Sequence, residues 1–189
     1  MLHAIAVLAL LVLTGCSSTP TRFYMLTSVP AASVIPGPPL TPPIEVGQIS
    51  LPDILDRDSI VVRGVGDQLD VMGEQVWGGP IDEMIRGTLS TDLTARLPPG
   101  SVLPPGDPGT KAGVRVLVVN IQRFGGDTSG RVVLAAEWTV FRNDALTAPP
   151  PRPVSIEMKA ASGTVADIVP VMSRAMGALA DRIAQGLGE

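Results

Sequence analysis

The stretch 114-VRVLVVNIQRFGGDTSGRVVLAAEWTVFR-142 contains two apolar segments on either side of a short segment with three glycines. Residues 116–119 are apolar at consecutive positions, which is typical of a strand buried on both faces, so residues 114–124 are expected to form a central strand. In residues 131–142, apolar side chains recur at every second position, which indicates a second strand. Residues 125–130 have the composition of a turn. The stretch therefore predicts an antiparallel hairpin at the centre of a sheet.

Further strand patterns lie on both sides of this hairpin. After it, Val154, Ile156, Met158 and Ala160 alternate with polar residues, which predicts a half-buried strand. Before it, compact apolar segments bounded by turn residues predict four more strands, and the last two of these read as a hairpin. These four segments are residues 23–26, 44–49, 60–63 and 68–72.

Two segments have helical periodicity. In residues 81–97, an apolar side chain recurs every fourth residue after Pro80, and Pro98 ends the pattern. The second helix is expected at about residues 165–187, with a later start indicated by Pro170. Helices segregated from a sheet make an α+β fold. We therefore expect a two-layer sandwich, in which two main helices pack on a mostly antiparallel sheet.

The N-terminus has the features of a secretory leader. Residues 4–13 form an uninterrupted apolar run, shorter than the roughly 20 residues that span a bilayer. The run ends at Leu13-Thr14-Gly15-Cys16, which resembles the lipobox of bacterial lipoproteins. We expect residues 1–15 to be a lipoprotein signal peptide, residues 16–22 a lipidated tether, and residues 23–189 a single periplasmic domain. The alternative is an ordinary leader followed by a cysteine that occurs there by chance.

Cys16 is the only cysteine, so no intramolecular disulfide can form. Lipidation would remove a thiol that is otherwise exposed to an oxidising periplasm. Bacterial lipoproteins also carry an amide-linked acyl chain, and two or more chains hold a protein stably on a membrane. In such lipoproteins an aspartate after the cysteine favours the inner membrane. By this resemblance, Ser17 implies the periplasmic face of the outer membrane.

Composition argues against an enzyme and against a nucleic-acid-binding protein. The only histidine, His3, would leave with the leader, which excludes Ser-His-Asp and Cys-His catalysis and most zinc sites. The two lysines, Lys111 and Lys159, have no serine nearby in a nucleophile context. The net charge of −4 does not suit a nucleic-acid partner. We therefore expect no catalytic residue, no cofactor and no metal.

One acidic cluster and one tryptophan have two interpretations each. Asp53, Asp56 and Asp58 are candidates for a calcium site or an acid pair, but Arg57 among them favours a solvated turn. Trp77 precedes the first helix, where it either caps the core or contacts a partner.

Several segments together resemble one family. They are Cys16, then RFYML at 22–26, VGQISLPDILDR at 46–57 and IVVR at 60–63. They look like the corresponding parts of the ABC-type transport auxiliary lipoproteins, the PqiC/YmbA-like family. The chain departs from that family at Trp77-Gly78-Gly79-Pro80, where an acidic residue before the proline is more usual.

The resemblance implies a compact α+β domain and a role beside MCE-domain proteins and ABC transporters, which move lipids between the two membranes of a Gram-negative envelope. It implies a non-catalytic docking subunit on the outer membrane and leaves self-association open. The residues expected to contact the partner are Leu51, Pro52, Ile54, Leu55 and Arg57, with Trp77 next. The competing interpretation of these residues is an ordinary buried strand and turn.

A second function remains open, that of an envelope lipoprotein which regulates cell-wall synthesis or pilots a secretin. In that case the Pro-rich residues 28–43, which include six prolines, would be a spacer. Such a segment reaches on the order of 50 Å when it is fully extended. If residues 23–26 pair into the domain, the segment is only a loop, so this pairing separates the two hypotheses.

Overall fold

The computed structural model describes residues 19–104, 114–142 and 149–188 of the chain. The predicted leader, Cys16 and Lys111 lie outside these ranges. The elements within the ranges are, in chain order, β1 (Arg22–Tyr24), β2 (Ile44–Ser50), β3 (Ser59–Arg63), β4 (Leu69–Trp77), α2 (Ile81–Thr94), β5 (Val102–Leu103), β6 (Arg115–Gly126), β7 (Arg131–Arg142), β8 (Arg152–Lys159) and α3 (Val165–Gly188).

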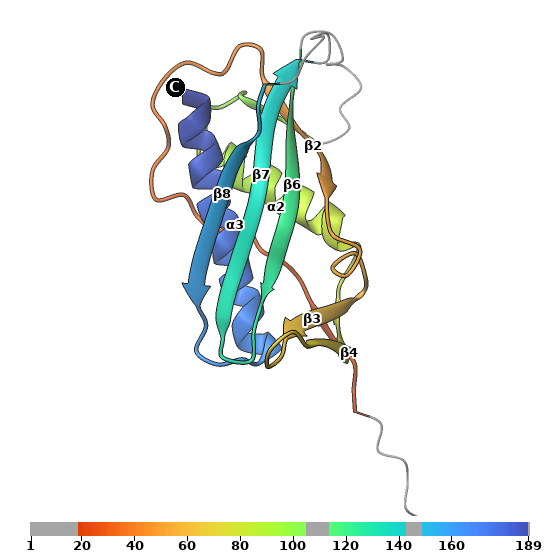
Figure 1. Ribbon diagram of the computed structural model, residues 1–189. Helices are drawn as coiled ribbons and strands as arrows, with labels where there is room; N and C mark the ends of the chain where they lie inside the picture. The colour runs from red at the N-terminus through yellow and green to blue at the C-terminus, as the bar shows by residue number, and fades with distance from the viewer. Residues whose placement is uncertain (1–18, 105–113, 143–148, 189) are drawn as a thin grey trace, which may run out of the picture.

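The strands form a five-stranded sheet in the order β5-β2-β6-β7-β8 and a three-stranded sheet in the order β1-β4-β3. Figure 1 shows both helices on one face of the larger sheet and the smaller sheet at one end of the molecule. The α+β class is confirmed. Both sheets are mixed, however, because β2 runs parallel to β6 and β5, and β1 runs parallel to β4. Between β2 and β6 the chain passes through α2, and such a crossover is what a parallel pair needs.

The predicted central hairpin is present as β6 and β7. Its pairing runs from Arg115 opposite Arg142 to Gly126 opposite Val132, and β8 continues the antiparallel order beside β7. In the turn, the Asp127 carboxylate accepts hydrogen bonds from the backbone N–H groups of Ser129 and Arg131. Burial alone would raise the pKa of Asp127, but these bonds and one from the Ser129 hydroxyl hold the pKa below its usual range.

The two helices fill the space behind the larger sheet with the apolar residues expected from their periodicity. Ile85, Leu89 and Leu93 of α2 are fully buried. The α3 stripe is buried in the same way and comprises Ile168, Met172, Met176, Leu179 and Ile183. α3 begins at Val165, so the later start expected from Pro170 is wrong. Pro170 lies on the exposed face, where water can reach the hydrogen-bonding positions that the proline ring leaves open.

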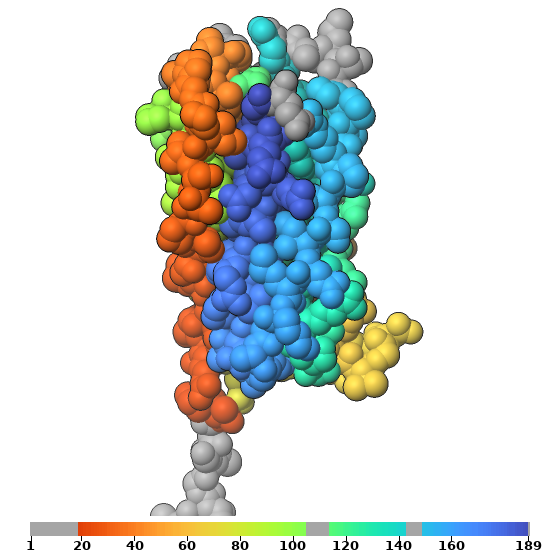
Figure 2. Space-filling view, turned by 90° about the vertical axis from the view of Figure 1, so that its left-hand side faces the viewer, coloured from red at the N-terminus to blue at the C-terminus, as the bar shows by residue number. Residues whose placement is uncertain are grey.

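The N-terminal segment is bound to the domain along its length. In β1, Phe23 lies opposite Val76 and Tyr24 opposite Trp77 of β4. The Pro-rich segment, residues 28–43, then runs beside α3, as the orange atoms of Figure 2 show. Within it, the backbone N–H of Val29 donates to Asp92 Oδ1 at 2.8 Å. The N–H groups of Ile35 and Leu40 donate to Arg96 O at 2.8 Å and to Ser101 Oγ at 2.9 Å. The segment is therefore a packed loop.

A buried charged cluster lies under this loop. Arg96 Nε donates to Asp181 Oδ1 at 2.5 Å, and Arg96 Nη1 donates to the backbone oxygens of Val29 and Asp92 at 3.1 and 2.9 Å. The side chains of Arg96 and Asp92 are only 3% and 0% exposed. Burial raises the pKa of Asp92, although the Val29 N–H and the Arg96 charge oppose the rise.

Candidate partner-binding site

The connection from β2 to β3 is a tight turn that presents apolar side chains. The carbonyl of Pro52 accepts hydrogen bonds from the N–H groups of Leu55 at 2.8 Å and Asp56 at 3.2 Å. The carbonyl of Asp58 accepts one from the N–H of Trp77 at 2.7 Å, which fixes the turn to the end of β4. Asp53, Asp56, Arg57 and Asp58 are exposed, as a solvated turn requires.

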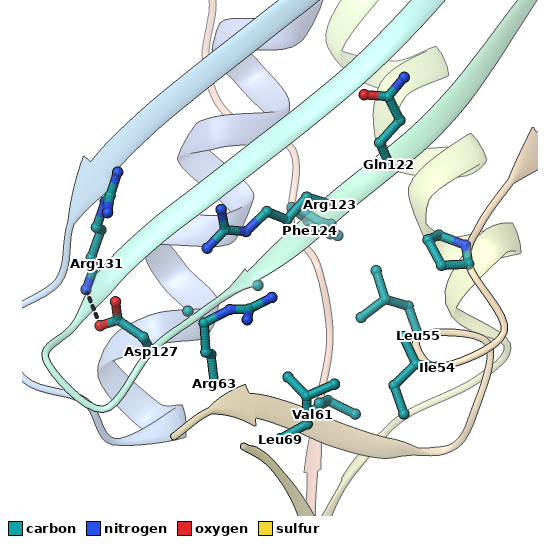
Figure 3. A pocket seen from close by; sticks show the side chains of 13 residues that line it. Ile54, Leu55, Val61, Arg63, Leu69, Gln122, Arg123, Phe124, Asp127 and Arg131 are labelled. Carbon is teal, nitrogen blue, oxygen red and sulfur yellow. Dashed lines mark hydrogen bonds between the residues drawn. The ribbon is translucent and has the colours of Figure 1, made fainter. Parts of the chain in front are cut away.

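The apolar side chains of this turn form one wall of an open pocket with a volume of ≈ 100 Å³. The pocket lies between the turn, the β3–β4 hairpin and the adjoining ends of β6 and β7 (Figure 3). Its apolar lining includes Ile54 and Leu55 from the turn and Val61, Leu69 and Phe124 from the strands. A pocket of this size is far smaller than the roughly 300–1,000 Å³ of a typical small-molecule site. The pocket is instead large enough to accept a single side chain of a partner protein.

Arginines line the opposite side of the pocket. Arg63 comes from β3 and Arg123 from β6, and Figure 3 shows both across from Ile54 and Leu55. No carboxylate within the described ranges lies at ion-pair distance from Arg63 or Arg123. The third arginine, Arg131, differs because its guanidinium donates two hydrogen bonds of 2.6 Å to Glu157. The pocket thus combines an apolar wall with two cations that have no ion pair in the described part of the molecule.

A β-bulge places Arg123 at the pocket. The register between β6 and β7 shifts between Ile121 and Arg123. As a result, Gln122 and Arg123 are both exposed, whereas Ile121 and Phe124 on either side are both buried. A bulge adds one residue to a strand and redirects its side chains. Without it, strict alternation would send Phe124 away from the core.

The six residues expected to contact a partner fall into three groups. Pro52, Ile54 and Leu55 line the pocket. Leu51 and Trp77 point inward instead and, with Leu55, line a void of only ≈ 10 Å³ on the core side of the turn. Trp77 is 7% exposed, so it caps the core. Arg57 is exposed and lines neither cavity, which leaves its predicted contact role a proposal.

The strand residues of the pocket were not anticipated from the sequence: Val61, Arg63, Leu69, Arg123 and Phe124. One signal was available. Apolar residues recur at every second position through Leu117, Val119 and Ile121, and the next one, Phe124, comes three positions later. Such a break in period indicates a bulge, and bulges are frequent beside functional sites.

Solved structures share this fold. The crystal structure of an uncharacterised protein has a TM-score of 0.71 and 23% identity, and the match covers 89% of this chain and 99% of that one. Protein XCC0632 from Xanthomonas campestris has a TM-score of 0.69 and 16% identity, with 87% and 93% of the two chains covered. At these identities the likeness shows the fold. No helix within the described ranges is long and apolar enough to cross a membrane.

Sequence comparison identifies the family. The chain is similar to the intermembrane transport lipoproteins PqiC of Escherichia coli (strain K12) and Shigella flexneri, with 27% identity over 133 residues, or 69% of this chain and 70% of each relative. The family model of the ABC-type transport auxiliary lipoprotein component matches residues 24–184, which include every residue that lines the pocket. This chain therefore belongs to the family of ABC-type transport auxiliary lipoprotein components.

Proposed function

We propose that this protein is a lipid-anchored periplasmic subunit of an ABC-type transport system, and that it docks an MCE-domain protein at the outer membrane. The family match over residues 24–184 carries the proposal. Cys16 would hold the domain on the membrane, and the subunit would act by binding rather than by catalysis. The names of the PqiC relatives, which describe intermembrane transport lipoproteins, support a role in transport between membranes.

The pocket supports a docking role because its composition resembles that of a protein interface hot spot. Such hot spots have a small desolvated cavity beside arginine side chains, and they accept an aromatic or aliphatic side chain of the partner. Ile54 and Leu55 supply the apolar wall, and Arg63 and Arg123 supply cations for a carboxylate of the partner. We therefore propose Pro52, Ile54, Leu55, Arg63 and Arg123 as the docking residues.

The packing of the N-terminal segment favours docking over the spacer hypothesis. A secretin pilot or cell-wall regulator on a long tether would need residues 28–43 to be extended away from the domain. Instead β1 pairs with β4, and backbone hydrogen bonds hold Val29, Ile35 and Leu40 against the body. The free length between Cys16 and β1 is then only a few residues.

A pull-down with a matched pair of variants tests the proposal. The full-length lipoprotein is purified in detergent from its own host, and the associated proteins are identified by mass spectrometry. We expect an MCE-domain protein to be recovered. Ile54→Asp should reduce the recovery at least about tenfold, since hot-spot residues contribute roughly 2 kcal/mol or more. Ile54 is 37% exposed, so the variant should still fold.

Val34→Asp is the control, because Val34 is also an exposed apolar residue, at 56%, but lies outside the pocket. It should recover the partner as well as the wild type does. Equal recovery with both variants would show that the pocket is not the docking surface. If the wild-type protein recovers no MCE-domain protein although its lipid anchor is intact, the proposed function is wrong.

A further inference from the structure

The exposed apolar side chains of this protein gather around the smaller sheet. Of the seven large apolar residues that are exposed in the described ranges, five belong to this sheet, to its β3–β4 turn or to the residue after β1. These five are Phe23, Met25, Val65, Val71 and Leu69, of which Leu69 also lines the pocket described above. Phe23 and Met25 are 72% and 62% exposed, although a phenylalanine and a methionine are commonly buried. Their exposure therefore indicates that a partner molecule or a membrane surface covers them.

The geometry of β1 sends Phe23 and Met25 outward. The residue between them, Tyr24, is half-buried, and its hydroxyl donates a hydrogen bond to Gln75 Oε1 at 3.1 Å. Since successive side chains of an extended chain alternate in direction, Phe23 and Met25 share the side opposite Tyr24. Met25 also lies over Gly78, where a Cβ would meet its Cγ at 3.0 Å. The backbone of Phe23 is thus fixed by its pairing with β4, and Met25 is fixed by its contact with Gly78.

Covalent reach places this pair close to the proposed lipid anchor. Phe23 follows Cys16 by seven residues, and a fully extended chain covers at most ~3.6 Å per residue, so the two are at most roughly 25 Å apart. Figure 1 shows the N-terminal segment leaving the molecule at the same end as the smaller sheet. With Cys16 held in a membrane, that end of the domain stays within reach of the lipid.

The charge of the segment suits a membrane surface. Between Cys16 and Ile44 the sequence has a single charged side chain, Arg22, and the first acidic residue is Glu45. The chain as a whole has a net charge of −4, so this is its locally basic part. At a membrane interface, aromatic rings lie at the level of the lipid headgroups, and arginine side chains extend their charge toward water. An exposed aromatic side chain beside an arginine therefore suits such a surface.

We propose that Phe23 and Met25 insert into the interfacial region of the membrane that holds the lipidated Cys16, so that the smaller sheet faces the bilayer. This inference rests on the proposed lipid anchor. The acyl chains alone would leave the domain free to rotate on its tether. Insertion of Phe23 and Met25 adds a second contact with the lipid, which fixes how the domain stands above the membrane surface.

Fluorescence quenching by brominated lipid tests the orientation. Phe23→Trp and, as a matched control, Val34→Trp are made in the full-length acylated protein. Each is reconstituted into vesicles of phosphatidylethanolamine and phosphatidylglycerol, with and without phosphatidylcholine brominated near the headgroup end of its acyl chain. Trp77 and Trp138 are 7% and 6% exposed and contribute a constant background emission, which is measured with the wild-type protein and subtracted. Phe23 and Val34 are both largely exposed, so both variants should fold.

We expect the emission of Trp at position 23 to fall by about half or more, because an interfacial side chain lies only ~5–10 Å deep and close to the bromines. The emission of Trp at position 34 should not change. No quenching at position 23 in protein that co-sediments with the vesicles would overturn the inference. Shielding of that tryptophan from aqueous acrylamide without quenching by brominated lipid would assign the surface to a second copy instead. Failure of the acylated protein to co-sediment would count against the lipid anchor itself.

Discussion

Asp92 and Arg96 lie one turn apart in and just after α2, at the edge of its apolar stripe. Sequence periodicity gave no reason to expect them to be buried, because the residues that cover them are far away in the chain. Val29 contributes a backbone N–H to Asp92, and Asp181 contributes a carboxylate to Arg96. A buried ion whose partner is removed costs about 3–5 kcal/mol, so these charges stabilise the protein only as a set.

The buried carboxyl of Asp92 predicts a specific pH dependence. Burial raises its pKa in the folded state above the ordinary value of an aspartate, so the folded state binds the proton more tightly than the unfolded state does. The cost of the charge is therefore present above the folded-state pKa and is relieved as the pH falls through it. In Asp92→Asn this titration is absent, and the Asn oxygen can still accept the Val29 N–H.

We expect the stability of the wild type to increase relative to that of Asp92→Asn when the pH is lowered from about 7 to about 4.5. Urea unfolding of both proteins at several pH values measures this difference, in which the other titrating groups largely cancel. Parallel pH profiles would show that Asp92 has an ordinary pKa in the folded state.

At the scale of elements, periodicity predicted most of the fold. Both helices, the β6–β7 hairpin, β8 and β3 are close to the expected residues, because each depends on a local pattern. β4 begins where expected but continues to Trp77, five residues beyond the predicted end. The parallel pairing of β2 with β6 was missed, since only the tertiary arrangement decides which strand fills the place beside a central one. The short β5 was also missed, and with two residues it is too short to have a period.

Two turn glycines give a matched test of the hairpins. Gly66 in the β3–β4 turn and Gly130 in the β6–β7 turn both have a left-handed backbone, with φ of 66° and 84°. A Cβ at Gly66 would meet nothing within 4 Å, whereas one at Gly130 would lie 2.7 Å from the Ser162 carbonyl oxygen. Gly66→Ala should therefore cost about 1 kcal/mol from backbone strain alone.

Gly130→Ala should cost about 1–3 kcal/mol more than that, because the added methyl group also displaces the loop after β8. Urea unfolding of the two variants measures the difference. Similar losses of stability in the two would mean that the contact between this turn and Ser162 relaxes without cost.

At the scale of the whole molecule, the turn of residues 51–57 was singled out from the sequence, but the pocket beside it was not. The turn is contiguous and carries a recognisable motif, so a single sequence reveals it. The opposite wall needs Arg63 and Arg123, which come from two different sheets and meet only in the folded protein. The site could therefore be predicted as a segment but not as a cavity.

The proposed anchor predicts the location of the molecule in the cell. Cys16→Ser removes the thiol that the proposed lipidation needs. The variant should therefore move from the membrane fraction to the soluble periplasmic fraction, as immunoblotting of fractionated cells would show. The proposed insertion of Phe23 and Met25 would be too weak to retain it without the lipid anchor. If the serine variant stays in the membrane fraction after a high-salt wash, Cys16 is not the anchor.

The packed N-terminal segment also has a consequence for the order of folding. The contacts that hold it join residues far apart in the chain: 63 positions separate Val29 from Asp92, and 146 separate Thr27 from Ser173. Contacts of such long separation are slow to form, because closing a long loop costs conformational entropy before the contact is gained. During synthesis, the contact between Thr27 and Ser173 therefore cannot form until α3 has been made. If Cys16 is lipidated as proposed, an enzyme that acts on the chain before α3 has been made would meet this segment before its contact with α3 has formed.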